Sequence, residues 1–345
     1  MPGHALLYGP VPSRRLGYSL GVDILPFKTC SMDCVYCQLG ASARTFVRRR
    51  EFVPADEVLA QVRAELESGK RIDAITFSGS GEPTLHSGIR KIIRGIKGMT
   101  AVPVVVLTNS STLAGAAGRR AIAEADIVVP SLDAATEPIF ARINRPHPGL
   151  TAAGIIAGLA EFRKSFRGEI WLEIMLVKGI NDGAGHLRAL KKAVRLIRPD
   201  RVQLNTVVRP PAERTARPLS AAEMERIRSF FGGKAETLVR ADKTRPERGG
   251  NDPRTKPGAP AAAIVRVNKT RPEYGGNDPQ ARLGAPAAVI AAILGMAGRR
   301  PVTAADLSRS LGTPAADVIA LAARLEKRGL LRSVRHRNRT FFEAV

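Results

Sequence analysis

The sequence predicts an α/β protein built on a partial (β/α)6 TIM-like barrel, or on an equally curved open sheet. Over roughly the first 230 residues, short apolar runs alternate with helical periodicity, and six such strand–helix units can be counted. The chain has 345 residues, which is enough for one large domain and a small one. In either form of sheet, ligands gather at the carboxyl ends of the strands.

The elements follow from local pattern. Strands are predicted where short runs are apolar and β-branched, and helices where apolar residues recur every three or four positions. The predicted strands span residues 19–25, 74–78, 102–107, 127–132, 169–176 and 201–205. The predicted helices between them span residues 54–68, 89–96, 151–166, 186–197 and 221–231.

Composition divides the chain into three parts. Residues 1–239 carry the barrel, residues 240–285 are rich in Pro, Gly and Arg, and residues 286–345 are predicted to fold as a small domain. The middle part contains a unit that begins at Lys243 and recurs at Lys269, a period of 26 residues. Two copies are too few for a solenoid, so a duplicated linker is the simpler interpretation. A binding role over the mouth of the sheet is the alternative.

The last part is predicted as three helices, 286–296, 303–311 and 314–328, then two strands at 330–335 and 340–343. This order resembles a winged helix-turn-helix. The predicted wing, residues 332–339, carries four arginines and a histidine. Such a wing neutralises phosphates in DNA-binding versions of the module, whereas winged helices in many enzymes contact only protein or substrate, and both interpretations stay open.

Charge and hydropathy narrow the class of protein. The formal net charge is +23, a field that attracts polyanions at low salt, although it can also follow genomic base composition. No apolar run approaches the length of about 18 residues that a bilayer requires. The N-terminus lacks the pattern of a secretory signal. We therefore expect a cytoplasmic protein with no membrane association.

Three cysteines, Cys30, Cys34 and Cys37, are the only ones in the chain. An odd number at this spacing excludes a disulfide framework and favours a metal site. A structural zinc site needs a fourth ligand, for which the candidates are Asp33, His4 and His86. Three thiolates also suit a cubane iron–sulfur cluster with one open iron, where a small chelating molecule can bind and receive an electron.

The spacing Cys-x-x-x-Cys-x-x-Cys, with Tyr36 before the third cysteine, resembles the signature of the radical S-adenosylmethionine (radical SAM) superfamily. The resemblance implies a 4Fe-4S cluster on Cys30, Cys34 and Cys37, which would be the catalytic and metal-binding residues. It implies that S-adenosylmethionine binds the open iron and is cleaved reductively to a 5′-deoxyadenosyl radical that abstracts hydrogen from a substrate. An electron donor such as flavodoxin or ferredoxin would then be a partner.

The resemblance continues after the second predicted strand. The segment Ser78, Gly79, Ser80, Gly81, Glu82 and Pro83 is similar to the Gly-Gly-Glu-Pro motif of the family, which contacts the amino group of the methionine moiety. Glycines allow backbone carbonyls to approach a ligand closely. Ser80 stands where the family often has glycine. The other predicted cofactor contacts are Tyr36, Asn109, Ser131 and Asp133, the last three of which could instead serve as ordinary turn and cap residues.

Substrate contacts are predicted at the ends of the last two strands, at Lys178, Asn205 and Arg209. Residues 8–17, 26–30 and 36–40 further resemble a subgroup that includes wyosine-type tRNA-modifying enzymes. Those enzymes use additional cysteines for a second cluster, and this chain has none to supply one. Their substrates are therefore not carried over.

Two classes of function remain. The leading hypothesis is a radical SAM enzyme whose basic C-terminal domain recruits the substrate, with RNA and tRNA in particular expected first and a protein or peptide next. The alternative is a transcriptional regulator whose iron–sulfur cluster senses redox state or iron and whose winged helix binds DNA. The regulator hypothesis accounts for the basic C-terminal domain, but it accounts neither for the Gly-Glu-Pro segment nor for the six βα units.

Overall fold

The computed structural model describes residues 6–42, 44–238 and 287–345, and the repeat predicted at 240–285 lies outside them. Its largest feature is an eight-stranded sheet with the strands in chain order. All neighbours in this sheet are parallel except β1 and β2, which form an antiparallel hairpin. The strands are β1 Leu7–Ser13, β2 Gly17–Val22, β3 Ala74–Phe77, β4 Val104–Thr108, β5 Ile127–Pro130, β6 Glu169–Leu176, β7 Arg201–Thr206 and β8 Ala235–Thr237.

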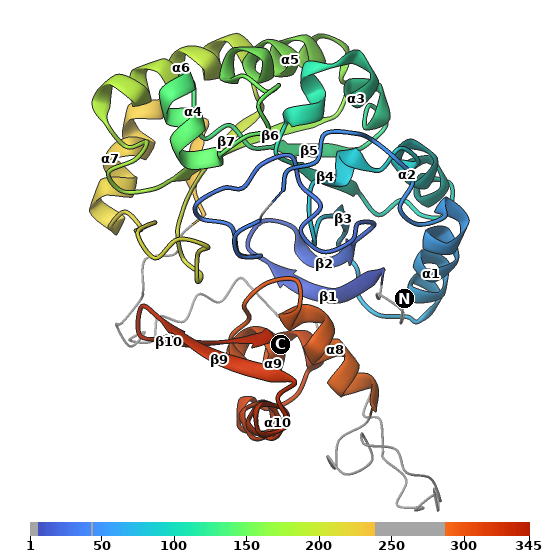
Figure 1. Ribbon diagram of the computed structural model, residues 1–345. Coiled ribbons are helices and arrows are strands. Elements are labelled where there is room, and N and C mark those ends of the chain that lie inside the picture. Colours follow the sequence, from blue (N-terminus) through green and yellow to red (C-terminus); the bar gives the residue numbers. More distant parts are fainter. Residues whose placement is uncertain (1–5, 43, 239–286) are drawn as a thin grey trace, which may run out of the picture.

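Helices connect the parallel strands and surround the sheet (Figure 1). They are α1 Ala55–Glu67, α2 Ile89–Lys97, α3 Ala116–Ala121, α4 Glu137–Asn144, α5 Ala152–Ser165, α6 Ala184–Ile197 and α7 Ala221–Phe231, with short 3-10 turns at Pro83–Leu85 and Ser111–Ala114. The predicted α/β fold with a partial TIM-like barrel is confirmed. No helix in the described part of the chain is long and apolar enough to cross a membrane.

The strands are buried on both faces, as expected for parallel strands covered by helices. Successive residues point to opposite faces, so Ile75 and Phe77 join the large core that also holds the helices. Ala74, on the other face of β3, packs with Val105 and Trp171 in a smaller cluster contributed by the neighbouring strands. Apolar packing on this second face is limited to the smaller cluster, and polar groups gather toward the carboxyl ends of the strands.

The six predicted strands are present as β2 to β7, with ends that differ by up to three residues. Four elements were not predicted: β1, β8, α3 and α4. The strand β1 contains Pro10 and Pro12, which read as turn residues, but β1 is an edge strand and an edge tolerates proline. Both β8 and α3 are too short to show a clear period.

The C-terminal part has the predicted order of three helices and two strands: α8 Ala287–Ala297, α9 Ala304–Leu311, α10 Ala315–Lys327, β9 Leu331–His336 and β10 Arg339–Ala344. It has its own apolar core, which includes Ile293, Leu307 and Phe342. Val11 of β1 belongs to the same core, and α8 and α9 both contact β1. The C-terminal helices therefore pack directly against the edge of the barrel (Figure 1).

Candidate functional site

The three cysteines lie on one loop that follows β2, and all are partly buried and free of disulfides. The loop is fixed to two other parts of the barrel. The Val35 amide donates to the carbonyl of Ile143 in α4 at 3.0 Å, and the Glu82 amide donates to the carbonyl of Thr29 at 2.9 Å. The loop therefore has a defined position beside the segment that follows β3.

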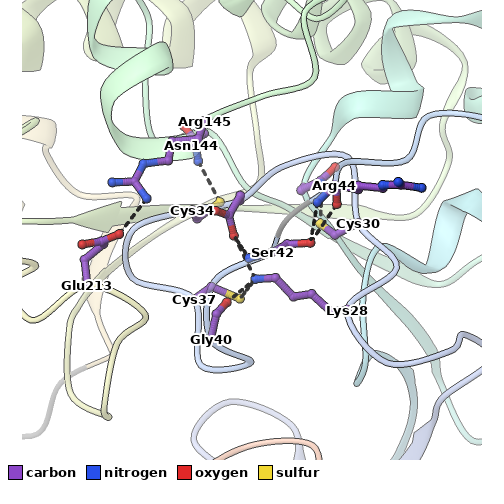
Figure 2. A network of polar contacts seen from close by, with 12 residues as sticks. Lys28, Cys30, Cys34, Cys37, Gly40, Ser42, Arg44, Asn144, Arg145 and Glu213 are labelled. Atoms are coloured by element: carbon purple, nitrogen blue, oxygen red, sulfur yellow. Dashed lines mark hydrogen bonds and ion pairs between the residues drawn. The ribbon is translucent and has the colours of Figure 1, made fainter.

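Each cysteine sulfur receives a hydrogen bond from a different side chain. The Asn109 amide donates to Cys30 Sγ at 3.3 Å, Asn144 donates to Cys34 Sγ at 3.4 Å, and Lys28 Nζ donates to Cys37 Sγ at 3.0 Å. Figure 2 shows the last two of these contacts on the cysteine loop. Donors of this kind stabilise negative charge on sulfur and tune the potential of an iron–sulfur cluster.

The donor set fits an iron–sulfur cluster better than a single ion. Within the described ranges, no three His, Cys, Asp or Glu side chains converge closely enough to hold one metal ion. In a cubane cluster each cysteine binds a separate iron, so the sulfurs need not converge on one point. Burial raises the pKa of the Cys30 thiol to about 12 and that of Cys34 well above its usual range. Burial therefore disfavours the thiolate forms, and metal binding supplies the positive charge that offsets this cost.

Glu82 organises the segment that follows β3. Glu82 is 2% exposed, and its carboxylate accepts hydrogen bonds from the Thr84 backbone amide at 3.1 Å, the Thr108 hydroxyl at 2.7 Å and the Asn109 backbone amide at 2.5 Å. Burial raises the pKa of Glu82, and these donors oppose the shift. Glu82 therefore ties the segment after β3 to the residues that follow β4.

Asp23 also holds the Ser78–Pro83 segment in place. Its carboxylate accepts from the Ser80 amide at 3.1 Å and from the Ser80 hydroxyl at 2.6 Å. This contact gives Ser80 a role that glycine could not perform. A Cβ at Gly79 would lie 2.5 Å from Asp23 Cγ, and one at Gly81 would lie 1.9 Å from the Thr29 carbonyl oxygen, so both glycines are required by close packing.

Asp23 is joined in turn to the C-terminal part of the chain. Arg299 Nε donates to Asp23 Oδ2 at 2.9 Å, and the two side chains are only 6% and 1% exposed. The Arg299 guanidinium also lies 4.8 Å from the centre of the Tyr8 ring, and the Tyr8 hydroxyl is hydrogen-bonded to Ser78 Oγ at 2.5 Å. A buried ion pair thus connects the C-terminal helices to the Ser78–Pro83 segment.

The predicted residues at the ends of β4 and β5 meet in one place. A small cavity is lined by Tyr36, Asn109, Ser131 and Asp133, together with Met32 and Asn144. Asp133 accepts from the Tyr36 hydroxyl, from Asn144 Nδ2 at 2.8 Å and from the Met175 amide at 2.9 Å. Burial raises the pKa of Asp133 to about 6 despite these donors.

Two of the three predicted substrate residues lie at the mouth of the barrel, and one does not. Asn205 is buried and accepts from Arg14 at 3.3 Å, and Arg209 donates to Gln38 in the cysteine loop at 3.2 Å. Lys178 is exposed and pairs with Glu223 of α7 at 2.9 Å. It contacts neither of the other two.

Sequence reasoning missed several residues of this region. Arg15 pairs with Glu173 and donates to Gln203 at 2.7 Å, a polar network contributed by the β1–β2 hairpin, β6 and β7. The signal for Arg15 was present in the Ser13–Gly17 turn, where two arginines follow each other. No local signal identified Asp23 or Asn144, because their partners are distant in the sequence.

A partial barrel with polar residues gathered at the carboxyl ends of its strands defines an α/β-barrel enzyme with its site at that rim. Within this class the match is specific: the model of the radical SAM superfamily matches residues 24–204. The chain belongs to the radical SAM superfamily. Membership confirms the resemblance found in the sequence, makes the protein an enzyme of this superfamily, and implies S-adenosylmethionine and an iron–sulfur cluster.

Curated relatives of the chain carry several different names. The chain is 33% identical over 228 residues to a UPF0026 protein of Methanocaldococcus jannaschii, covering 66% of this chain and 71% of that one. It is 43% identical over 225 residues, 65% of its length, to a Brachyspira hyodysenteriae protein named GTPase Obg, and spans only 33% of that relative. It is 28% identical to a dual-specificity RNA methyltransferase of Nitratidesulfovibrio vulgaris, with 58% and 55% covered.

Among solved structures, the chain resembles a radical SAM methyltransferase from Sphaerobacter thermophilus, with a TM-score of 0.49 and 20% identity. The match covers 64% of this chain and 65% of that one.

Proposed function

We propose that Cys30, Cys34 and Cys37 hold a 4Fe-4S cluster and that the protein cleaves S-adenosylmethionine to start radical chemistry on a substrate at the mouth of the barrel. When bound and reduced, the cluster supplies the electron that splits the cofactor into methionine and a 5′-deoxyadenosyl radical, which takes a hydrogen atom from the substrate. A flavodoxin or ferredoxin is the proposed electron donor.

The observation that carries this proposal is the set of donors around the cysteines. Lys28, Asn109 and Asn144 come from three different places in the chain, and each donates to a different sulfur. Three separate donors are not needed by neutral thiols, which are weak acceptors, but they suit thiolates that carry charge on sulfur.

The chain's own groups also suit the second cofactor. The backbone of residues 78–81 would receive the amino group of the methionine moiety, held in place by Glu82 and Asp23. Tyr36, Asn109, Ser131 and Asp133 line the adjoining cavity and would contact the remainder of S-adenosylmethionine. These assignments support a cofactor that lies across the ends of β3, β4 and β5.

RNA is the substrate class that we favour, and tRNA in particular. The net charge of +23 and the exposed arginines Arg335, Arg337 and Arg339 on the β9–β10 hairpin suit a polyanion. The similarity to an RNA methyltransferase, at 28% identity, points the same way. Residues 286–345 would then act as a winged-helix-like domain that recruits RNA to the core formed by residues 1–239.

The first experiment tests the chemistry without a substrate. The full chain is reconstituted anaerobically with iron and sulfide, reduced with dithionite and given S-adenosylmethionine, and 5′-deoxyadenosine is measured by mass spectrometry. We expect the product from the wild type and none when the three cysteines are replaced by alanine. Phe27→Leu is the matched control, because Phe27 lies in the same loop and is 60% exposed.

The substrate is tested in the same assay. Purified tRNA should accelerate formation of 5′-deoxyadenosine, whereas a mixture of peptides should not; the reverse result would contradict RNA. The enzyme proposal fails if the protein with a fully loaded cluster gives no 5′-deoxyadenosine and if its electron paramagnetic resonance spectrum does not change when S-adenosylmethionine is added. Redox-dependent DNA binding would then support the iron–sulfur regulator.

A further inference from the structure

The segment between the cysteine loop and α1 carries a run of positive charge and an exposed aromatic ring. Residues 44–50 contain four arginines and no acidic residue. Arg44, Arg48 and Arg50 are exposed, and Phe46, which lies among them in the sequence, is 41% exposed. The segment therefore presents cations and an apolar ring on one short stretch of surface.

Backbone hydrogen bonds fix this segment beside the cysteine loop. The Phe46 amide donates to the carbonyl of Cys30 at 2.7 Å, and the Arg50 amide donates to the carbonyl of Leu85 at 3.0 Å, in the short 3-10 turn after β3. Figure 2 shows Arg44 near Cys30, with its guanidinium directed away from the three sulfurs. The segment therefore runs along the rim of the barrel, from the cysteine loop to the residues that follow β3.

Arg49 anchors the same segment through its side chain. Its guanidinium donates to two backbone carbonyls, that of Thr84 at 2.8 Å and that of His86 at 3.3 Å. The Arg50 guanidinium lies 4.7 Å from the centre of the Phe52 ring, a favourable contact that leaves its charge uncompensated. Because these contacts and the backbone hydrogen bonds already fix the segment, the other two arginines are not needed to hold it.

The charge of the segment is not neutralised by neighbouring acids. In the part of the chain that the structure describes, neither Arg44, Arg48 nor Arg50 forms an ion pair with a carboxylate, and the side chains of Arg44 and Arg48 donate no hydrogen bond. Arg90 of α2 provides a contrast, because it pairs with Glu124 at 2.9 Å. Residues 44–50 therefore keep a local excess of positive charge.

Arginines around an exposed ring fit single-stranded nucleic acid. Guanidinium groups donate in pairs to phosphate oxygens, and an aromatic ring can stack on a base that is unpaired. An acidic protein fits less well. A stable protein interface buries about 800 Å² on each partner around an apolar core, whereas residues 44–50 expose only Phe46 and Val47 as large apolar side chains.

We propose that residues 44–50 form a binding surface for single-stranded RNA, in which Arg44, Arg48 and Arg50 hold phosphates and Phe46 stacks on an unpaired base. The contact between Phe46 and Cys30 places this surface next to the cysteine loop. RNA bound there lies at the rim of the barrel, beside the proposed cluster. The choice of RNA as the polyanion rests on the proposed function.

The first test measures the role of charge. Fluorescence anisotropy follows the binding of a labelled oligouridine to the unreduced, cluster-loaded full chain at several salt concentrations. Arg44→Gln and Arg48→Gln should each weaken binding about threefold or more and reduce the slope of log affinity against log salt by about 0.7, the value for one phosphate contact on a single strand.

Arg188→Gln is the matched control for charge. Arg188 is exposed on α6, which connects β6 to β7, and it forms no ion pair within the described residues. The substitution removes the same charge at a distance from the proposed surface. It should change oligouridine affinity less than about twofold and leave the salt slope unchanged, because distant charges are screened.

The second test separates stacking from charge. Phe46→Leu keeps an apolar side chain but removes the ring, so it should weaken oligouridine binding about fivefold or more without changing the salt slope. Phe46→Tyr keeps a ring and should retain the affinity of the wild type. The duplex of oligouridine with oligoadenosine has no unpaired base, so Phe46→Leu should not change its affinity.

Four results would overturn the proposal. They are no oligouridine binding by the wild type, equal losses of affinity in Arg48→Gln and Arg188→Gln, wild-type affinity in Phe46→Leu, and a marked fall in iron content or melting temperature in both Arg44→Gln and Arg48→Gln. A fifth result would identify a different partner. If the arginine variants slow reduction of the cluster by flavodoxin but bind RNA normally, the segment receives an acidic electron donor instead.

The proposed function and this surface can fail separately. Formation of 5′-deoxyadenosine by the wild type is measured without RNA, so its absence would refute the radical chemistry while RNA binding at residues 44–50 stands. Conversely, a wild type that forms 5′-deoxyadenosine but whose RNA affinity does not depend on Phe46 or the arginines would overturn the surface and leave the chemistry intact.

Discussion

Replacing Arg299 by methionine should destabilise the chain far more than replacing an exposed arginine. The substitution keeps much of the side-chain volume but removes the guanidinium that faces the carboxylate of Asp23, which is 1% exposed. Breaking a buried ion pair by removing one partner costs about 3–5 kcal/mol, because the remaining charge stays desolvated. Loss of the contact with the Tyr8 ring adds about 0.5–2 kcal/mol, while the two hydrogen bonds from Ser80 to Asp23 offset part of the loss.

The assay is urea-induced unfolding of the full chain, compared with Arg90→Met. Arg90 pairs with Glu124 at 2.9 Å, but its side chain is 48% exposed, so this control should lose no more than about 1 kcal/mol. The double variant Asp23→Asn with Arg299→Met removes both charges. It should be less destabilised than the sum of the two single variants by about 0.5–3 kcal/mol. A loss in Arg299→Met no larger than in Arg90→Met, or strict additivity in the double variant, would refute the reasoning.

Three further predictions follow from individual contacts. Gly81→Ala places a Cβ 1.9 Å from the Thr29 carbonyl oxygen. It should lower the free energy of unfolding by about 1–3 kcal/mol and reduce the iron content measured after reconstitution. Gly183→Ala, whose Cβ would have no atom within 4 Å, should change neither quantity. Asn144→Leu removes the donor to Cys34 Sγ. In a redox titration, the reduction potential of the reconstituted cluster should become more negative by about 20–60 mV. An unchanged potential would mean that this hydrogen bond does not act on the cluster. The pKa of Glu223 is lowered to about 2, first by the backbone amide and hydroxyl of Ser220 and then by Lys178. The ionised carboxylate of Glu223 therefore adds fully to the stability of the fold above pH 4.5, and this contribution is lost as the pH falls toward 2. The stability advantage of the wild type over Glu223→Gln should therefore shrink over that interval in acid unfolding, and an advantage that is constant with pH would contradict the assignment.

The rim of the barrel was predictable because parallel strands bring their carboxyl ends to one edge. Tyr36, Asn109, Ser131 and Asp133 were predicted from the family resemblance and from their positions in the cysteine motif or after strands, and they line one cavity. The same rule selected Lys178, which follows β6 but turns outward to Glu223. Strand-end position therefore predicts which edge a residue occupies, but not the direction of its side chain.

The unpredicted residues are those whose partners lie far away along the chain. Asn144 and Cys34 are separated by 110 residues, and Arg299 and Asp23 by 276. No local period records such contacts. Ser80 illustrates the same limit, because it reads as a departure from the family's glycine until Asp23 is seen behind it.

Arg299 links the C-terminal helices to the segment where S-adenosylmethionine is proposed to bind. It pairs with Asp23, which accepts hydrogen bonds from Ser80, and the Arg299 and Asp23 side chains are buried. Cofactor binding should therefore favour the docked position of the C-terminal helices. Because such coupling is reciprocal, loss of this link should weaken S-adenosylmethionine binding by about 5-fold or more.

Calorimetry of S-adenosylmethionine binding to the cluster-loaded chain measures this effect. Arg299→Met should bind the cofactor more weakly than the wild type, because the link through Asp23 is gone. Arg90→Met should keep the wild-type affinity. If Arg299→Met binds the cofactor as tightly as the wild type, the ion pair between Arg299 and Asp23 serves only to attach the C-terminal helices to the barrel.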